Sequence, residues 1–472
     1  MFQYIVKRIL YFIPTLFVIS LLAFGLSKCT PGDPCNAGGG EENSKSSFIN
    51  FEDETRSRCE LFGLDKPTFY FALTSRAYPD SLYKILQKDQ RKSWNNLIAQ
   101  YGNWDQISAY KTSIRTLQLK LFDIPDSLGK RAIRKIKNES EFLKILSKDE
   151  AINAKLKKIE TIYNNSPAFE NFIAKEIVAL KNYYNLIKEK STPNQLYVPT
   201  IHWYGFDNQY HNWITNFLTG DFGISYKTYR PVFSEIRDAI FWTFLMMSLA
   251  LILSYSVAIP LGVFSAKNKN LRFDKIVTVL LFVLYSLPAF WVATMMVVFL
   301  TTPEYGSWTN IFPGIGLGNL SSNAPFWERF WETAKHLILP VLCLSYNRLA
   351  FISRQMRGGM LGVIQEDYIR TARAKGLGEQ SVIWKHGFRN SLFPIITLFA
   401  NILPSTLAGS VIIEFIFNIP GMGKLTLDAI SQENYPIVFA VLMIAALATL
   451  VGILIADILY AVADPRISFD KK

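Results

Sequence analysis

The stretch that decides the fold of this chain runs from residue 240 to residue 263 and reads IFWTFLMMSLALILSYSVAIPLGV. It contains no charged side chain, and as an α-helix rising 1.5 Å per residue it spans roughly 36 Å, enough to cross the apolar core of a bilayer. Five more apolar stretches occupy residues 9–26, 276–300, 336–352, 392–413 and 437–462. The pattern predicts an all-α, polytopic membrane protein with six transmembrane helices.

The composition agrees with membrane segments. Half of the residues are hydrophobic and only 19% are charged, whereas a soluble domain carries about 25% charged residues. The first stretch follows Lys7 and Arg8, so it is either a signal peptide or a transmembrane helix. No small-residue cleavage site follows it, and we therefore expect residues 1–28 to form an uncleaved N-terminal transmembrane helix.

Basic residues indicate the sidedness of the spans. The loop after the second span holds Lys267, Lys269, Arg272 and Lys275, and the loop after the fourth holds Arg354, Arg357, Arg370, Arg373, Lys375, Lys385 and Arg389. The short connections on the opposite face carry only Arg329, Lys335 and Lys424. The positive-inside rule then places both termini, including the tail 466–472, in the cytoplasm.

This topology divides the chain into regions. Residues 29–238 are expected in the periplasm, and residues 239–465 form a core with five spans and a cytoplasmic loop at 354–390. Helix-start signals at Pro79-Asp80, Pro125-Asp126 and Ser166-Pro167 predict a helical periplasmic lobe over about 75–192. Its apolar stripes are expected to form its own core.

The formal net charge of +12 raises the question of a nucleic-acid partner. Much of the excess lies between Ser81 and Lys190, where 21 Lys and Arg face 12 Asp and Glu. This block is predicted to lie outside the cytoplasm and shows no nucleic-acid-binding motif. A solvated basic face, or a surface for a partner protein, is the better interpretation.

Cysteine and histidine residues give few signals. Three cysteines fall on the predicted outer side, where one disulfide can form, and the pairing stays open among Cys29, Cys35 and Cys59. Cys343 falls in a span, and the histidines are dispersed at positions 202, 211, 336 and 386. We therefore expect no metal site.

The segment most informative for function is the loop 366–394, which reads EDYIRTARAKGLGEQSVIWKHGFRNSLFP. A helix is expected to end near Gly376, where glycine permits a sharp reversal, and a second short helix leads toward the next span. Such an element can dock on a partner and pass rigid-body motion to the spans. The alternative is a solvated basic loop that only satisfies the topology, and the pattern alone leaves both open.

The loop resembles the EAA-type coupling motif of bacterial ABC importer permeases, in its oligopeptide/dipeptide version. The match runs from Asp367 to Leu377 and returns at His386, Arg389, Asn390 and Pro394, although Arg370 and Thr371 replace the Glu-Ala start of the broader motif. Further matches are Pro31–Pro34, Phe62–Pro67, Gly220–Ser225, Arg230–Val232, Glu414, Pro420–Gly423, Tyr435-Pro436 and Asp464–Arg466. The lobe at 75–192 departs from the family pattern as an insertion of unknown role.

The resemblance implies a permease subunit of the bacterial inner membrane. A homologous second permease, two cytoplasmic ABC ATPase subunits and an extracytoplasmic substrate-binding protein would be its partners. This chain would bind no cofactor and have no catalytic residue, because ATP and Mg²⁺ belong to the ATPase subunits. The residues expected to couple to them are Asp367, Tyr368, Arg370, Thr371, Ala372, Arg373, Ala374, Lys375, Gly376, Leu377, His386, Arg389 and Asn390.

Polar residues within the spans are candidates for the substrate pathway, because burying them in a membrane is costly. Asn347, Glu414 and Asp457 are such candidates, and structural pairing between helices is the alternative for them. Arg348 is expected to snorkel toward the cytoplasmic face. The segment at 421–425 superficially resembles a phosphate-binding loop, but Asn418 and Leu425 occupy positions that the motif reserves for Gly and Ser/Thr.

Two other functions compete with transport. A non-transporting membrane sensor or scaffold would use the periplasmic helical lobe to bind a ligand and would predict a cytoplasmic signalling domain. A membrane-embedded enzyme would place clustered acidic, His or Ser residues at one depth, and the sequence shows no such cluster.

Overall fold

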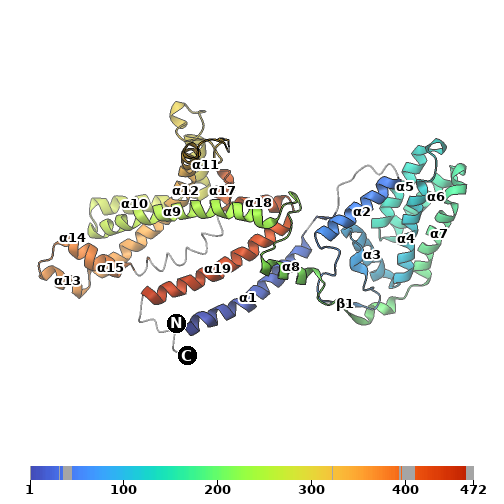
Figure 1. The fold of residues 1–472 in the computed structure, drawn as a ribbon, viewed down its shortest axis with the longest axis horizontal. Helices are drawn as coiled ribbons and strands as arrows, with labels where there is room; N and C mark the ends of the chain where they lie inside the picture. The colour runs from blue at the N-terminus through green and yellow to red at the C-terminus, as the bar shows by residue number, and fades with distance from the viewer. Residues whose placement is uncertain are drawn as a thin grey trace. The chain divides into compact units, whose positions relative to one another are not determined.

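The computed structural model describes residues 2–30, 32–35, 45–321, 323–392, 395 and 410–463. These residues form two compact units. One unit comprises the N-terminal segment to Thr30 together with residues from Gly220 onward, and the other runs from Pro31 to Thr219. Figure 1 labels the elements of both units.

The second unit is a helical lobe joined to a two-stranded ribbon. Strand β1 (Phe71–Ser75) pairs antiparallel with β2 (Pro199–Trp203). Because one strand precedes the lobe and the other follows it, the ribbon holds the two ends of the lobe together. The α-helices of this unit are α2 (Lys45–Leu61), α3 (Lys88–Tyr101), α4 (Trp104–Leu121), α5 (Lys130–Ile145), α6 (Asp149–Asn164), α7 (Glu170–Glu189) and α8 (Gln209–Thr219).

The lobe has its own hydrophobic core, as its sequence predicts. Helices α4 and α7 pack together, and so do α5 and α6. Ile173, Ile177 and Leu180 on α7 are buried, which confirms the apolar stripe read from the sequence. Between α2 and β2, all of which the structure describes, the 3₁₀ turns are η1 (Leu82–Lys84), η2 (Asp126–Leu128), η3 (Pro167–Phe169) and η4 (Pro193–Tyr197).

The predicted helix starts in the lobe are only partly correct. Pro125 and Pro167 each open a short 3₁₀ turn, and the α-helices begin a few residues later. The Ser166 side chain makes no capping hydrogen bond. A proline fixes φ for a first turn, but it does not determine whether that turn continues as an α-helix.

Polar contacts also hold the lobe together, and those of Lys111 and Asp149 join several of its helices. The Lys111 ammonium donates to the carbonyl oxygens of Leu143 and Lys144 at 2.9 and 2.8 Å, near the end of α5. Asp149 accepts hydrogen bonds from the phenol groups of Tyr101 and Tyr184. Burial raises the pKa of Asp149, but these hydrogen bonds outweigh it and hold that pKa below its usual range.

One disulfide closes the beginning of this unit. Cys35 and Cys59 are bonded and buried, which ties the segment that follows the first helix to α2. Cys29 is exposed and free, and Cys343 is buried and free. The pairing that the sequence left open is therefore Cys35 with Cys59.

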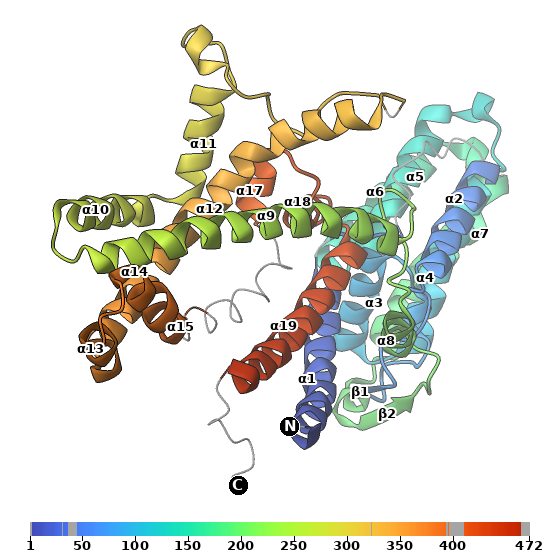
Figure 2. The same cartoon turned by 60° about the vertical axis from the view of Figure 1, so that its left-hand side comes forward.

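The first unit is built on long apolar helices. In the described residues, four helices are long and apolar enough to cross a membrane: α1 (Phe2–Cys29), α9 (Val232–Lys267), α12 (Phe326–Ile364) and α19 (Tyr435–Ala463). Helices α9 and α12 lie side by side (Figures 1 and 2) and run in the same direction, since residues 254 and 262 of α9 approach residues 345 and 353–357 of α12. The all-α polytopic class is thus confirmed.

The predicted third span, 276–300, is not one straight helix. It consists of α10 (Arg272–Ser286) and α11 (Ala289–Leu300), which meet at an angle of 95°. Pro288 supplies no N–H to the helix and forces Leu287 into an extended conformation, so the helix stops there. The Tyr346 hydroxyl donates to the freed Leu287 carbonyl at 2.8 Å. The pair makes a fifth crossing if it counts as one span.

Two other expected spans lie at 392–413 and at the N-terminus. The stretch 392–413 lies largely outside the described residues, which resume at Ser410 before α17 (Val411–Ile416) and α18 (Met422–Ser431). The N-terminal stretch forms α1, which contacts α19: the Tyr4 hydroxyl and the Arg8 guanidinium both bind the Asp457 carboxylate, at 2.9 and 2.8 Å.

Candidate functional site

The loop that carries the sequence motif folds into a compact helical elbow. It contains α13 (Asp367–Ala374), α14 (Glu379–Ser381), the π-helical turn η6 (Val382–Gly387) and α15 (Phe388–Ser391). Gly376 ends the first helix with φ of +78°, the left-handed conformation expected for a sharp reversal. Figure 2 shows this elbow gathered at the end of α12.

Side-chain contacts fix the shape of the elbow. Ile369 and Ala372 on α13 are buried against Val382. Arg373 donates two hydrogen bonds to the Glu379 carboxylate, at 2.7 and 3.1 Å, across the turn at Gly376. The Asn390 amide donates to the Tyr368 hydroxyl at 2.7 Å and ties α15 to α13. The elbow is thus an internally packed element.

The elbow is joined to the membrane helices through α12. Ile383 belongs to the same buried cluster as Met356 and Met360 of α12. Gly387 lies beside the Met360 side chain, and the Ser391 hydroxyl contacts the Met360 sulfur at 2.9 Å. Packed side chains therefore connect α13 to α12.

Most of the predicted coupling residues lie on the free face of this elbow. The exposed ones are Asp367, Tyr368, Arg370, Thr371, Arg373, Ala374, Lys375, Gly376, Leu377, Arg389 and Asn390. His386 is half-buried, whereas Ala372 is only 7% exposed. Ala372 thus contributes to packing inside the elbow, and hydropathy could not reveal this because alanine is common on both helix faces.

The start of the predicted loop, residue 354, falls within a helix. Helix α12 continues to Ile364, so Arg354 and Arg357 lie on a helix. Arg357 makes a bidentate ion pair with Asp274 of α10, with both N–O distances at 2.7 Å. Ser265 of α9 also donates to this carboxylate, so Asp274 joins α9, α10 and α12. The sequence pattern indicated Arg357 only as a topology charge, and Asp274 was not predicted as a site residue, although an acidic residue among basic ones is a usable signal.

Glu414, a pathway candidate, is fully buried and has several partners within the unit. Its carboxylate accepts hydrogen bonds from the Thr243 hydroxyl at 2.9 Å and from the backbone N–H groups of Gly423 and Lys424 at 2.7 and 3.1 Å. The last two groups open α18, where an N-terminus favours an anion. A Cβ added at Gly421 would lie 2.5 Å from this carboxylate, which explains the glycine.

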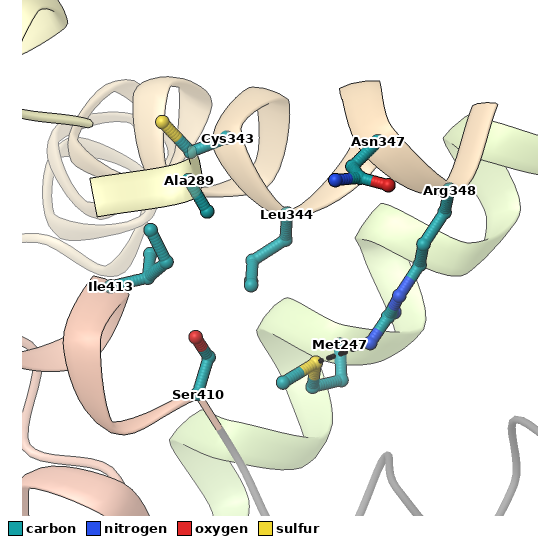
Figure 3. Close-up of a pocket in the computed structure, with 8 residues that line it drawn as sticks. All are labelled: Met247, Ala289, Cys343, Leu344, Asn347, Arg348, Ser410 and Ile413. Atoms are coloured by element: carbon teal, nitrogen blue, oxygen red, sulfur yellow. Dashed lines mark hydrogen bonds between the residues drawn. The ribbon is translucent and has the colours of Figure 1, made fainter. Parts of the chain in front are cut away.

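The two remaining candidates for the substrate pathway have different surroundings. Asp457 is paired with α1, so its contacts, like those of Glu414, favour the structural interpretation. Asn347 instead lines a cavity in the membrane unit (Figure 3), together with Arg348 and Ser410. Arg348 does not extend along the helix toward its end, as snorkelling requires, but contacts Met247 of α9.

These features define the class of the protein. Long apolar helices held by buried polar contacts, with a docked elbow at the end of one of them, define a multi-pass membrane protein of the permease type. Residues 258–469 match the family described as "Binding-protein-dependent transport system inner membrane component". The chain belongs to this family, and it is a permease subunit of such a transport system.

Characterised relatives support the same assignment. The chain is 40% identical over 262 residues to the oligopeptide transport system permease protein AppB of Bacillus subtilis, covering 55% of this chain and 80% of AppB. It is 35% identical over 283 residues to the dipeptide transport system permease protein DppB of Lactococcus lactis, covering 59% of this chain and 87% of that relative. For DppB of Escherichia coli K12 the identity is 35% over 276 residues, covering 56% and 81%.

Proposed function

We propose that this chain is one of two membrane-spanning subunits of an ATP-driven importer that translocates peptides delivered by an external binding protein. The names of its relatives, which are oligopeptide and dipeptide permeases, support the substrate class. The observation that carries the proposal is the elbow, because it offers an exposed face to a partner while its buried face is packed on α12.

In this proposal the elbow receives the work of ATP hydrolysis. Two cytoplasmic ATPase subunits bind ATP and Mg²⁺, and one docks on the exposed face of α13. Closure of the ATPases displaces α13, and the contacts between η6 and Met360 transmit the displacement to α12. The bundle is then a bistable element whose equilibrium is set by a ligand bound on another chain. The chemistry stays on the ATPases, and this subunit itself hydrolyses nothing.

The proposal also assigns the sides of the membrane. The basic turn between α9 and α10 lies near the elbow, because Phe264 packs edge-on against Trp384. Helix α19 begins near the start of α9, where Ile437 packs with Val232 and Ile236, and it runs toward the opposite end, where Asp457 binds α1 near its N-terminus. This arrangement supports cytoplasmic termini and a periplasmic lobe in the inner membrane of a bacterium.

The test is co-purification of the chain with its ATPases, followed by peptide uptake into proteoliposomes that contain the complete transporter. Gly376→Val should reduce both ATPase binding and uptake, because a β-branched residue at φ of +78° is strained by roughly 1–2 kcal/mol. Gly376→Asn is the matched control, since asparagine tolerates this conformation and nothing lies within 4 Å of the added Cβ.

Ala372→Asp provides a second test, because it places an unpaired charge in the small core of the elbow. This variant should insert into the membrane but fail to bind the ATPases. Normal uptake by both Gly376→Val and Ala372→Asp would remove the elbow from the mechanism. A purified wild-type chain that never retains an ATPase would contradict the whole proposal.

A further inference from the structure

The membrane unit contains a cavity of about 300 Å³ whose lining is mostly apolar but includes one cationic side chain. Figure 3 shows its residues, which come from α9, α11, α12 and the start of α17. Met247, Leu344 and Ile413 supply apolar surface, and Asn347, Arg348 and Ser410 supply polar atoms. A largely apolar pocket with a few convergent polar groups is the usual form of a small-molecule site.

The Arg348 guanidinium in this cavity has no anionic partner among the described residues. One terminal nitrogen contacts the Met247 sulfur at 3.3 Å, which is a weak acceptor, and the other is buried without a hydrogen-bond partner. Tyr255 interacts with Arg348, but a phenol is neutral near pH 7 and supplies no counter-charge.

Three carboxylates in the described helices of this unit have partners other than Arg348. Asp274 binds Arg357, Glu414 binds Thr243 and the start of α18, and Asp457 binds Arg8. The undescribed stretch 396–409 contains no Asp or Glu in its sequence. An intramembrane arginine without a counter-ion is costly, and such residues mark functional sites.

The break between α10 and α11 adds partial positive charge to the same place. Helix α11 has 12 residues and begins at Ala289, which lines the cavity. The first backbone N–H groups of a helix have no partner within the helix and attract anions. In transporters, discontinuous membrane helices place such N-termini toward anionic groups of the substrate.

We infer that this cavity is a carboxylate-binding site in the translocation pathway and that Arg348 binds the C-terminal carboxylate of the transported peptide. A guanidinium binds a carboxylate through two parallel hydrogen bonds, and the apolar wall accommodates the adjacent side chain. This inference rests on the proposed function, because it takes the peptide as the cargo.

The experiment compares uptake of labelled Ala-Phe with that of Ala-Phe amide, using the complete transporter in proteoliposomes with its binding protein. Arg348→Met should lower uptake of the free acid at least about tenfold, which corresponds to loss of a charge-assisted hydrogen bond, and should leave uptake of the amide nearly unchanged. Arg348→Lys should restore part of the preference for the acid, because it keeps the charge. Any preference of the binding protein itself is the same in all variants.

Lys335→Met is the matched control, since it removes one exposed positive charge from the same helix and should leave the ratio of acid to amide uptake unchanged. Ala-Glu amide tests whether a side-chain carboxylate can replace the terminal one. If Arg348→Met lowers the uptake of Ala-Glu amide, Arg348 is not specific for the C-terminal carboxylate.

The outcomes are distinguishable. An unchanged acid-to-amide ratio in Arg348→Met would overturn the inference, and so would an equal loss of both substrates, which indicates a structural role or a carboxylate from the second permease. If the wild-type transporter moves neither peptide, the proposed function fails, whatever Arg348 does.

Discussion

At the residue scale, the contacts of Glu414 explain why residues 421–425 resemble a phosphate-binding loop although they lack two residues of that motif. The segment Gly421 to Lys424 resembles a phosphate-binding loop, and its backbone N–H groups do bind an anion. The anion is the carboxylate of Glu414, supplied by the same chain, and Gly421 allows it to approach. The turn therefore uses the chemistry of an anion site to join α17, α18 and α9.

Replacing Glu414 tests this role. Glu414→Ala should destabilise the purified chain by about 3 kcal/mol, since it leaves the N–H groups of α18 and the Thr243 hydroxyl unpaired in a buried site. Glu414→Gln should have a smaller effect, because the amide keeps one acceptor. The measurement is the unfolding temperature in detergent, and Glu433→Gln, at an exposed position, serves as the control. An unfolding temperature equal to that of wild type in Glu414→Ala would show that the carboxylate is not needed there.

At the scale of helices, the close approach of α9 and α12 depends on one glycine. A Cβ added at Gly262 would lie 2.7 Å from both the Met356 Cβ and the Ser353 carbonyl oxygen. The Ser254 hydroxyl donates to the Ser345 carbonyl across the same interface. Small residues let membrane helices pack closely and form such hydrogen bonds.

Gly262→Ala and Gly358→Ala have the same intrinsic effect on helix propensity, but they should affect the stability of the chain differently. Gly262→Ala should lower the unfolding temperature in detergent and reduce transport, because overpacking costs about 1–3 kcal/mol. Gly358→Ala on α12 has no atom within 4 Å of its new Cβ. It should be neutral or stabilise the helix by about 0.5–1 kcal/mol. Equal stability of the two variants would mean that the helices separate enough to accept the extra methyl group.

At the scale of the whole molecule, the chain consists of two units that each have their own core. The lobe contains Lys111, whose ammonium is buried in that core and hydrogen-bonded to carbonyl oxygens at the end of α5. Burial lowers the pKa of Lys111 to about 7. The lobe between α3 and α7 contains no histidine, so few other groups there titrate near neutral pH.

The stability of the lobe should consequently depend on pH. An unfolded lysine has a pKa near 10.4, so above pH 7 the unfolded lobe binds more protons than the folded one, and its stability rises by about 2 kcal/mol between about pH 7 and pH 9. Lys111→Met should abolish most of this rise. Limited proteolysis of the full chain at several pH values, with cleavage mapped to α3–α7, measures it. A rise that persists in Lys111→Met would assign the pH dependence to other groups.

Sequence patterns predicted well where the cause is local. Apolar length predicted the membrane class, and Gly376 predicted the end of α13, because backbone conformation and hydropathy depend on neighbouring residues. The break at Pro288 was not predicted. A proline is a signal for such a break, but this one lies within a continuous apolar run, and the run was interpreted as one span. Ala372 was predicted to couple to the ATPases, and its burial was not predicted, because that burial depends on Val382, which lies in a different turn.

The sequence by itself determined that the chain crosses a membrane several times and carries a coupling-type loop, because both follow from runs of adjacent side chains. Only the tertiary structure decided which polar groups meet. Glu414 binds Thr243 from 171 positions away, Cys35 pairs with Cys59 rather than with Cys29, and Arg348 faces a cavity instead of the membrane surface. Packing brings together partners that are this distant along the chain, and the spacing of residues in one sequence does not show which distant residues will meet.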